Sequence, residues 1–425
     1  MIEKIKKSTE PERAVIAGLA ADSMKIYDRS TEESLDELEA LLETAGGVCV
    51  GRVLQNRKKP EPRSFIGAGK VKELKELAKA NDCTLAVFDN ELSPSQMRAL
   101  TEDLDLRVID RSSLILDIFA GRASTREGRL QVELAQYNYL LPRLTGMWKH
   151  LTSQTGAGGA TPIGTRGPGE TQLESDRRHI HRKLDKLRDE LKEVIKTRDT
   201  QRRLREKNNI PVVALVGYTN AGKSTLLNTL TGAGIQAENR LFDTLDTTTR
   251  RLLVNEVQEI LISDTVGFIR KLPHHLVEAF KATLEELKYA DLILHVIDAS
   301  SPEWEEQVRV VDNMITTLGA GDSPRLEAFN KCDIPTESIR HHGENVVEIS
   351  AKTGQGIDEL LRKIEKNLSS NKKKVTLHLP YDKAGLLETL HREAVVTKTN
   401  YLDDFIEVEA TVNQSLYGKV KEYID

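Results

Sequence analysis

The eight residues from Gly217 to Ser224 constrain this chain more than any other stretch, because they form the pattern G-x-x-x-x-G-K-S. An apolar run, 212–216, precedes them and predicts a buried parallel strand, and a helical pattern, 225–230, follows them. In this strand–loop–helix context the pattern predicts a phosphate-binding loop, in which glycines let backbone N–H groups turn toward a phosphate at a helix N-terminus. The alternative, a glycine-rich turn with a chance Lys-Ser pair, leaves the two flanking elements unexplained.

The residues of this loop have separate expected tasks. Lys223 should reach the β- and γ-phosphates, and the Ser224 hydroxyl should be a ligand of Mg²⁺. The other predicted contacts to the nucleotide come from the rest of the loop and the first helical turn: Gly217, Tyr218, Thr219, Asn220, Ala221, Gly222 and Thr225.

Further segments follow the loop in an order that predicts a GTP site. A threonine-rich segment, 242–250, contains Thr244, and the apolar strand 259–262 leads to Asp264-Thr265-Val266-Gly267. Asp264 should hold the Mg²⁺ shell, and the Gly267 N–H should sense the γ-phosphate. The base should be bound by two later segments that contain Asn330, Lys331 and Asp333, and Ser350, Ala351 and Lys352.

Asp333 is the residue expected to select guanine. Its carboxylate can accept hydrogen bonds from N1–H and the exocyclic amine, donors that adenine lacks. A buried carboxylate left unpaired by the wrong base is costly, so discrimination of ~10⁴-fold is expected. Asn330 should either bond the ring edge or tie the loops together, Lys331 should pack over the base, and the Ala351 N–H should meet the guanine oxygen.

Phe268 occupies the position at which many Ras-like GTPases carry a glutamine that orients the attacking water. Phenylalanine cannot hydrogen-bond to water, so slow intrinsic hydrolysis is expected unless another group supplies charge. Asn220 is a candidate: its side-chain oxygen, with carbonyls of the switch segment, could hold K⁺. The alternative for Asn220 is a hydrogen bond that braces the loop. The catalytic set expected from sequence is therefore Lys223, Asn220 and Gly267.

The N-terminal part, 1–113, alternates strand-like and helix-like patterns, which predicts a small α/β domain with a mainly parallel sheet. The strands are expected at 14–19, 48–54, 85–89 and 107–110, and the helices at 34–42, 71–80 and 95–104. Gly67-Ala68-Gly69-Lys70 suggests an anion site, although such a segment is more often a turn that enters a helix.

Residues 114–209 predict an antiparallel helical hairpin of coiled-coil type, because apolar residues recur at spacings of four and three in two separate stretches. The loop between the helices, 145–170, contains seven glycines, and the second helix is expected at about 171–207. That helix has thirteen Lys and Arg against eight Asp and Glu, while the whole chain has a net charge of −5. A glycine-rich tip can approach a nucleic-acid backbone closely, and Trp148 and His150 could stack on bases. The alternatives are a solvated helix face and a disordered linker.

The expected fold class is therefore a multidomain α/β protein. The P-loop domain, 210–368, follows the hairpin, and a small α+β domain, 371–425, ends the chain. No apolar run reaches the 18 residues of a membrane span, and three cysteines lack metal-ligand spacing. These features favour a reduced, cytoplasmic protein, which we expect to be a monomer.

Beyond the nucleotide motifs, three stretches resemble the HflX family of GTPases: 64–71, the Arg-Gly-Pro-Gly-Glu-Thr-Gln-Leu-Glu block within 166–178, and 264–269 with its hydrophobic residue. The resemblance implies a GTPase that binds the large ribosomal subunit near its peptidyl-transferase centre. It also implies that the protein splits stalled ribosomes under stress and that ribosomes stimulate GTP hydrolysis. Thr244 matches the family's Mg²⁺-sensing threonine. The segment 245–248 lacks the family's usual proline, which makes Thr247, Thr248 and Thr249 rival ligands.

Two other functions remain open at the sequence level. The chain could be the GTPase partner of an RNA-modifying or ribosome-assembly complex, since Asn220 and Phe268 also suit GTPases of that kind. The N-terminal domain could use ATP to remodel RNA through Lys70, with Asp89 or Asp110 as the acidic residue at a strand end.

Overall fold

A computed structural model describes most of the chain. The described residues are 11–25, 28–143, 168–207, 210–232, 241–242, 248–254, 258–272, 276–277, 280, 285–335, 343–370, 372–402, 404–413, 416–417 and 420–424. Thr244, Thr247, Trp148, His150 and almost all of the predicted glycine-rich loop lie outside these residues.

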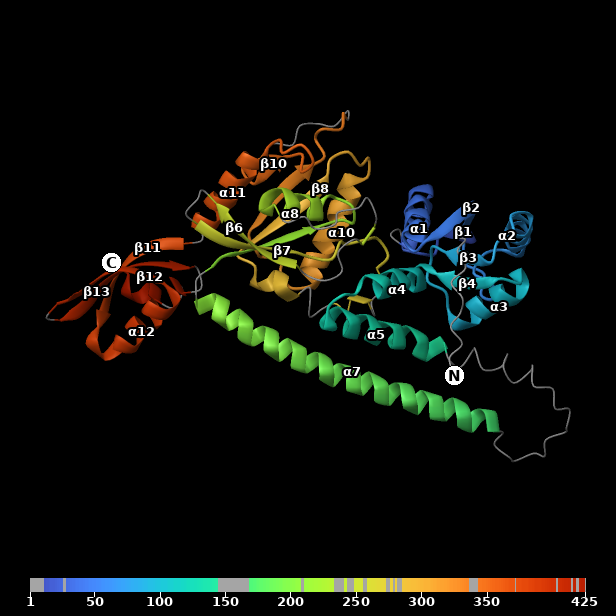
Figure 1. Cartoon of the computed structure of the whole chain (residues 1–425), viewed down its shortest axis with the longest axis horizontal. Coiled ribbons are helices and arrows are strands. Elements are labelled where there is room, and N and C mark those ends of the chain that lie inside the picture. Colours follow the sequence, from blue (N-terminus) through green and yellow to red (C-terminus); the bar gives the residue numbers. More distant parts are fainter. Residues whose placement is uncertain are drawn as a thin grey trace. The chain divides into compact units, whose positions relative to one another are not determined.

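The N-terminal sheet has four parallel strands in the order β2-β1-β3-β4 (Figure 1). The strands are β1 Glu12–Ala21, β2 Gly47–Arg57, β3 Leu85–Phe88 and β4 Arg107–Asp110. The helices α1 Glu32–Thr44, α2 Ala68–Ala80 and α3 Pro94–Leu104 connect them. Residues 85–88 are buried throughout, as expected for a central parallel strand covered on both faces. The predicted parallel α/β sheet is confirmed.

Local capping explains where the helices begin. The Ser93 hydroxyl accepts a hydrogen bond from the Gln96 N–H at the start of α3, and Pro94 occupies the first turn. Thr31 and Ser34 form the equivalent capping box at the start of α1. Both arrangements satisfy N–H groups that have no partner within the helix.

Among the described residues, the middle of the chain contains the helices α4 Arg111–Arg122, α5 Arg126–Leu140 and α7 Pro168–Lys207, and a 3₁₀ turn, Leu141–Arg143. Two ion pairs join α5 to α7: Lys183 lies 3.0 Å from Glu133, and Arg126 lies 3.8 Å from Glu190. Residue numbers rise along one helix as they fall along the other, so the two helices are antiparallel as predicted. Helix α4 packs against α1 and the N-terminal sheet as well as against α5.

The P-loop sheet has six strands in the order β10-β9-β8-β5-β7-β6, and only β6 is antiparallel to its neighbour. The strands are β5 Val212–Gly217, β6 Thr248–Val254, β7 Gln258–Asp264, β8 Leu292–Asp298, β9 Arg325–Asn330 and β10 Val346–Glu348. The helices are α8 Lys223–Thr231, α10 Trp304–Thr317 and α11 Ile357–Ser370, with a 3₁₀ turn at Glu285–Tyr289. The predicted motifs follow β5, β7 and β9, whose carboxyl ends meet at one edge of the sheet.

The C-terminal part is a three-stranded antiparallel sheet in the order β11-β13-β12. It consists of β11 Lys372–Pro380, α12 Ala384–Glu393, β12 Val395–Tyr401 and β13 Phe405–Asn413, with 3₁₀ turns at Tyr381–Lys383 and Lys421–Tyr423. Helix α12 packs against all three strands, which gives the small α+β fold that the sequence predicts.

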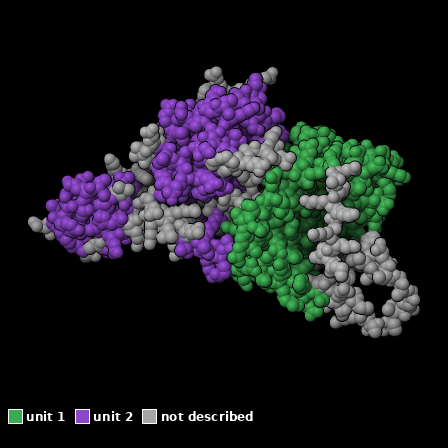
Figure 2. Space-filling model, viewed as in Figure 1, with its two compact units in different colours: residues 1–192, 238–246, 269–280 green, residues 193–237, 247–268, 281–425 purple. Residues whose placement is uncertain are grey.

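The chain divides into two compact units (Figure 2). The first contains residues 1–192, 238–246 and 269–280, and the second contains residues 193–237, 247–268 and 281–425. Two segments from within the predicted P-loop domain thus belong to the N-terminal unit. The predicted limits 1–113, 114–209, 210–368 and 371–425 remain predictions about where separately folding domains begin and end.

Asp89 is a buried carboxylate at the carboxyl edge of the N-terminal sheet, and four side chains donate hydrogen bonds to it. The hydroxyls of Ser30 and Ser34 donate to its Oδ2 at 2.6 and 2.8 Å, and Arg111 Nη1 donates to its Oδ1 at 2.8 Å. Lys271 also donates to Oδ2. Burial acts to raise the pKa of Asp89, but the Arg111 and Lys271 cations outweigh it and hold the pKa at about 2.

We expect this network to give a distinct acid dependence of stability. The folded-state pKa of Asp89 lies below the value of about 3.9 for an unfolded chain. The contribution of Asp89 to the free energy of unfolding, about 2–3 kcal/mol, is therefore complete above about pH 4 and is lost as the pH falls toward 2. Urea unfolding of wild type and Asp89→Asn should give a difference in unfolding free energy that is constant from pH 7 to 4 and narrows below pH 4. A difference that stays constant down to pH 2 would contradict this; Asp103→Asn, which removes a surface partner of Arg63, is the control.

Candidate functional site

The loop between β5 and α8 needs glycine at Gly222. Its φ is 94°, in the left-handed region, and a Cβ there would lie 2.2 Å from Asn330 Nδ2. Gly217 also needs the absence of a side chain, because a Cβ would lie 2.2 Å from the Val296 carbonyl oxygen. The loop therefore packs closely against the ends of β8 and β9, and it leads into the N-terminus of α8.

Lys223 lies inside this loop. Its ammonium donates to the carbonyls of Gly217 at 3.1 Å and Tyr218 at 2.8 Å. Burial lowers the pKa of Lys223 to about 8, and the Asp264 carboxylate opposes that effect. The geometry places a cation under the loop, where it can meet the phosphates of a nucleotide.

Two of the predicted Mg²⁺ ligands lie together. Ser224 Oγ donates to Asp264 Oδ2 at 3.0 Å, across the carboxyl ends of β5 and β7. Mg²⁺ prefers oxygen ligands in octahedral positions, and neighbouring positions are about 3 Å apart. The hydroxyl and the carboxylate therefore fit this ion, while Thr244, the third predicted ligand, lies outside the described residues.

The structure shows one of the two roles predicted for Asn330, and its bond to the ring edge remains a prediction. Its Nδ2 donates to the Ala221 carbonyl at 2.8 Å, and its Oδ1 accepts the Ala351 N–H at 2.9 Å. Asn330 therefore ties the phosphate-binding loop to the loop that contains Ser350, Ala351 and Lys352. In this arrangement the Ala351 N–H is already engaged, so its predicted bond to guanine remains a prediction.

Asp333 lies at the end of the site where the base is expected. Ser350 Oγ donates to Asp333 Oδ1 at 2.7 Å, and this hydrogen bond lowers the pKa of Asp333. The Asp333 side chain is exposed in this structure. The penalty for a wrong base therefore arises only when the base covers the carboxylate. Lys331 forms an ion pair of 2.6 Å with Asp298, a partner that sequence reasoning missed although Asp298 ends a strand at the same edge.

Phe268 contacts the phosphate-binding loop through its backbone. Its N–H donates to the Gly217 carbonyl at 3.1 Å, and its carbonyl accepts the Thr219 N–H at 2.7 Å. The Phe268 side chain is buried, so it packs into the protein and cannot orient water. These two bonds place Gly267 over Lys223: a Cβ at Gly267 would lie 3.1 Å from Lys223 Nζ.

Asn220 has a φ of 61° and an exposed side chain. That side chain makes no hydrogen bond within the part of the chain that the structure describes, so the loop-bracing alternative has no support there. Its role as a K⁺ ligand remains a prediction.

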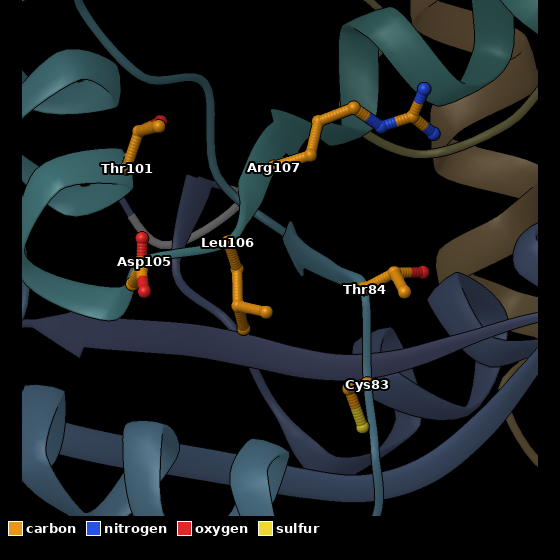
Figure 3. Close-up of a pocket in the computed structure, with 6 residues that line it drawn as sticks. All are labelled: Cys83, Thr84, Thr101, Asp105, Leu106 and Arg107. Atoms are coloured by element: carbon orange, nitrogen blue, oxygen red, sulfur yellow. The ribbon is translucent and has the colours of Figure 1, made fainter.

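The N-terminal segment Gly67–Lys70 is the turn that enters α2. The Gly67 N–H donates to Gln55 Oε1 at 2.8 Å, and Lys70 pairs with Glu73 at 2.8 Å. Figure 3 shows a separate hollow at the amino ends of β3 and β4, lined by Cys83, Thr84, Thr101, Asp105, Leu106 and Arg107. None of the predicted site residues lines it. The acidic candidates for an ATP site lie at the opposite ends of these strands, since Asp89 follows β3 and Asp110 is the last residue of β4. Asp89 is already hydrogen-bonded to Arg111, and Asp110 to Arg143.

Comparison with known proteins gives one family across the chain. Four family profiles match in order: "GTP-binding GTPase N-terminal" at 32–120, "GTP-binding GTPase Middle Region" at 122–205, "50S ribosome-binding GTPase" at 212–331 and "HflX C-terminal domain" at 337–416. The GTPase HflX of Lacrimispora saccharolytica is 45% identical over 428 residues, which cover 100% of this chain and 99% of that protein. This chain belongs to the HflX family.

A second curated relative agrees with this assignment. The GTPase HflX of Escherichia coli is 43% identical over 391 residues, which cover 90% of each chain. The solved complex of SsGBP with GDP aligns with a TM-score of 0.48 and 24% identity, over 84% of this chain and 99% of that one, a likeness too low to add to the assignment.

Membership of the HflX family establishes the activity. The protein is a GTPase, which binds GTP and GDP and hydrolyses GTP. None of the helices that the structure describes is long and apolar enough to cross a membrane.

Proposed function

We propose that this GTPase binds the large ribosomal subunit through its rRNA and dissociates stalled or idle ribosomes, notably under stress. In this proposal it acts in the cytoplasm as a monomer, and ribosomes stimulate its hydrolysis of GTP. The observation that carries the proposal is the match of residues 212–331 to the profile described as "50S ribosome-binding GTPase".

The charge distribution on α7 supports a contact with RNA. Arg177, Arg178 and Arg182 have exposed side chains in the turns nearest the glycine-rich segment. Farther along, the basic residues pair within the helix: Lys192 lies 2.9 Å from Asp189, and Lys196 lies 2.6 Å from Glu193. These exposed arginines suit a contact with RNA, because positive side chains are the main source of affinity for a phosphate backbone.

The nucleotide site supplies the proposed switch. The backbone amides and Lys223 bind the phosphates, Asp333 selects guanine, and Ser224 and Asp264 hold Mg²⁺, with Thr244 as the further proposed ligand. Bound Mg²⁺ would neutralise charge on the phosphates. Gly267 would then sense the γ-phosphate, and Asn220 would hold K⁺ near the developing charge.

Sedimentation of intact ribosomes through a sucrose gradient tests this function. With GTP or a non-hydrolysable analogue, the protein should convert intact ribosomes to subunits and migrate with the large subunit, whereas GDP should not support this. An unchanged ribosome peak, with the protein left at the top of the gradient in every nucleotide state, would refute the proposal.

A charge-reversal variant tests the RNA contact directly. Arg177→Glu/Arg178→Glu/Arg182→Glu should weaken binding to large subunits by at least about tenfold. Each arginine that neutralises a phosphate releases counterions and so favours binding, and the glutamates remove this contribution. Lys192→Glu/Lys196→Glu is the matched control, since these lysines pair along the helix, and it should lose much less affinity. Equal losses in the two variants would indicate a general charge effect and no specific contact.

A further inference from the structure

At the carboxyl edge of the N-terminal sheet, the carboxylate of Asp89 binds Lys271, a side chain from the predicted P-loop domain. In open α/β sheets, ligands bind beyond the carboxyl ends of the strands where the strand order reverses. In the order β2-β1-β3-β4 this point lies between β1 and β3. Asp89 follows β3 directly, and its carboxylate lies at that point.

Lys271 lies at this carboxyl edge. It is four residues beyond Gly267 and belongs to the same compact unit as Asp89, although 182 positions separate the two in sequence. Its ammonium donates to Asp89 Oδ2, and it lies 3.4 Å from Ser30 Oγ. The Lys271 side chain is only 9% exposed and that of Asp89 is 0% exposed, so this ion pair is removed from solvent.

Neighbouring charges support the same contact. Arg270 lies 3.8 Å from Glu37 of α1, and Glu37 also pairs with Arg111, which bonds Asp89. The side chains of Arg111 and Glu37 are 2% and 10% exposed. Two consecutive cations after the switch motif thus meet two buried carboxylates of the N-terminal domain. Removing one partner of such a buried ion pair is costly, because the other partner then remains as an uncompensated buried charge.

Aromatic packing holds residues that flank both switch segments. Phe119 of α4 lies edge-on to Phe242, with ring centroids 4.7 Å apart, and edge-on to Phe280, with centroids 5.1 Å apart. Phe242 is the first residue of the predicted threonine-rich segment, and Phe280 follows Lys271 in the sequence. Ile269 and Leu276 are buried in the same unit. The N-terminal domain therefore contacts the chain on both sides of the nucleotide-sensing residues.

We propose that Lys271 is a positioning residue for GTP hydrolysis, with Asp89 of the N-terminal domain as its anchor. The segment from Asp264 to Lys271 is held at three points: Asp264 by Ser224, Phe268 by Gly217 and Thr219, and Lys271 by Asp89. The unit boundary falls between Phe268 and Ile269, so continuous chain links the nucleotide site to the Lys271–Asp89 ion pair. The backbone of Gly267 must lie in one position to meet the γ-phosphate. Loss of the contact between Lys271 and Asp89 would let this backbone adopt other positions.

Steady-state GTP hydrolysis by the purified full-length protein, without ribosomes, tests this inference independently of the proposed ribosomal function. Lys271→Met keeps the length of the side chain and removes its charge. It should lower kcat by about tenfold and leave KM within about twofold, because misplacement of a reacting group by ~1 Å costs up to ~10²-fold in rate. Lys271→Arg, which keeps the charge, should retain most of the activity. Lys75→Met is the matched control, since this exposed lysine bonds the Asp103 carbonyl at 2.7 Å, far from Lys271 in the sequence, and it should behave as wild type.

A double-mutant cycle separates an anchor from two independent defects. Asp89→Asn should lower kcat as Lys271→Met does, and the double variant should be no slower than either single variant, because both remove the same contact. Wild-type kcat in Lys271→Met, or single effects that multiply in the double variant, would overturn the proposal. If Asp89→Asn fails to fold, the comparison of Lys271→Met with Lys271→Arg decides alone. Equal kcat values in the two variants would overturn the proposal, and a lower kcat in Lys271→Met only would support it.

Discussion

Asp333→Asn should lose GTP affinity by about 10²–10⁴-fold and gain affinity for xanthosine triphosphate. The carboxylate can accept two hydrogen bonds from guanine, and a bond to a charged group contributes about 1.5–3 kcal/mol. An asparagine can accept only one of them and presents an N–H₂ group to the exocyclic amine, so donor faces donor. Xanthine carries an oxygen at that position, which the asparagine can bond.

Titration calorimetry with GTP, ATP and xanthosine triphosphate measures this change. Ser350 should keep its hydroxyl bond to the substituted side chain, so the loop geometry is preserved. Glu344→Gln provides the control, because this carboxylate is 77% exposed and pairs with Lys366 away from the motif residues. Unchanged GTP affinity in Asp333→Asn would show that another group reads the base.

Gly222→Ala should abolish measurable nucleotide binding while the rest of the protein remains folded. The new methyl group would lie 2.2 Å from Asn330 Nδ2, and that amide joins the Ala221 carbonyl to the Ala351 N–H. Either Asn330 moves and both bonds are lost, or the phosphate-binding loop moves. Each outcome displaces amides that must converge on the phosphates, and we expect affinity to fall by about 10³-fold or more, since two bonds and the loop geometry are affected together.

Gly232→Ala is the matched control for this substitution. Gly232 ends the same helix, has a φ of 63° and has nothing within 4 Å of the added Cβ. Both substitutions therefore strain a left-handed backbone, at about 1 kcal/mol, and only Gly222→Ala creates a clash. Fluorescent GDP titration and thermal unfolding of the two variants should give similar small losses of stability and very different affinities. Similar affinities would mean that the Asn330 bridge does not shape the site.

Much of the site could be predicted because its signals are local. The phosphate-binding loop, Asp264 and the base-binding segments each follow an apolar strand, and parallel strands bring their carboxyl ends to one edge. The start of α3 was predictable for the same reason, since Ser93 and Pro94 act on the turn in which they lie. The contact of Ser224 with Asp264 follows from two adjacent strands, β5 and β7.

The partners of side chains across the chain could not be predicted. Sequence reasoning left Asn330 with two possible roles, and only the packing of the loops shows that it ties them together. Asp89 was a candidate for the acidic residue of a second nucleotide site, but in the fold it bonds two serines, an arginine and Lys271. Neither the charge nor the spacing of these residues in the sequence indicates that pairing.

The sequence by itself determined the family, the GTPase activity and the order of the elements, because motif spacing and hydrophobic periodicity depend on neighbouring residues. The tertiary structure alone decided that segments flanking the nucleotide-sensing residues belong to the N-terminal compact unit. The physical reason is that a buried ion pair such as Lys271 with Asp89 depends on where the chain returns in space, and residues 182 positions apart carry no mutual signal in a single sequence.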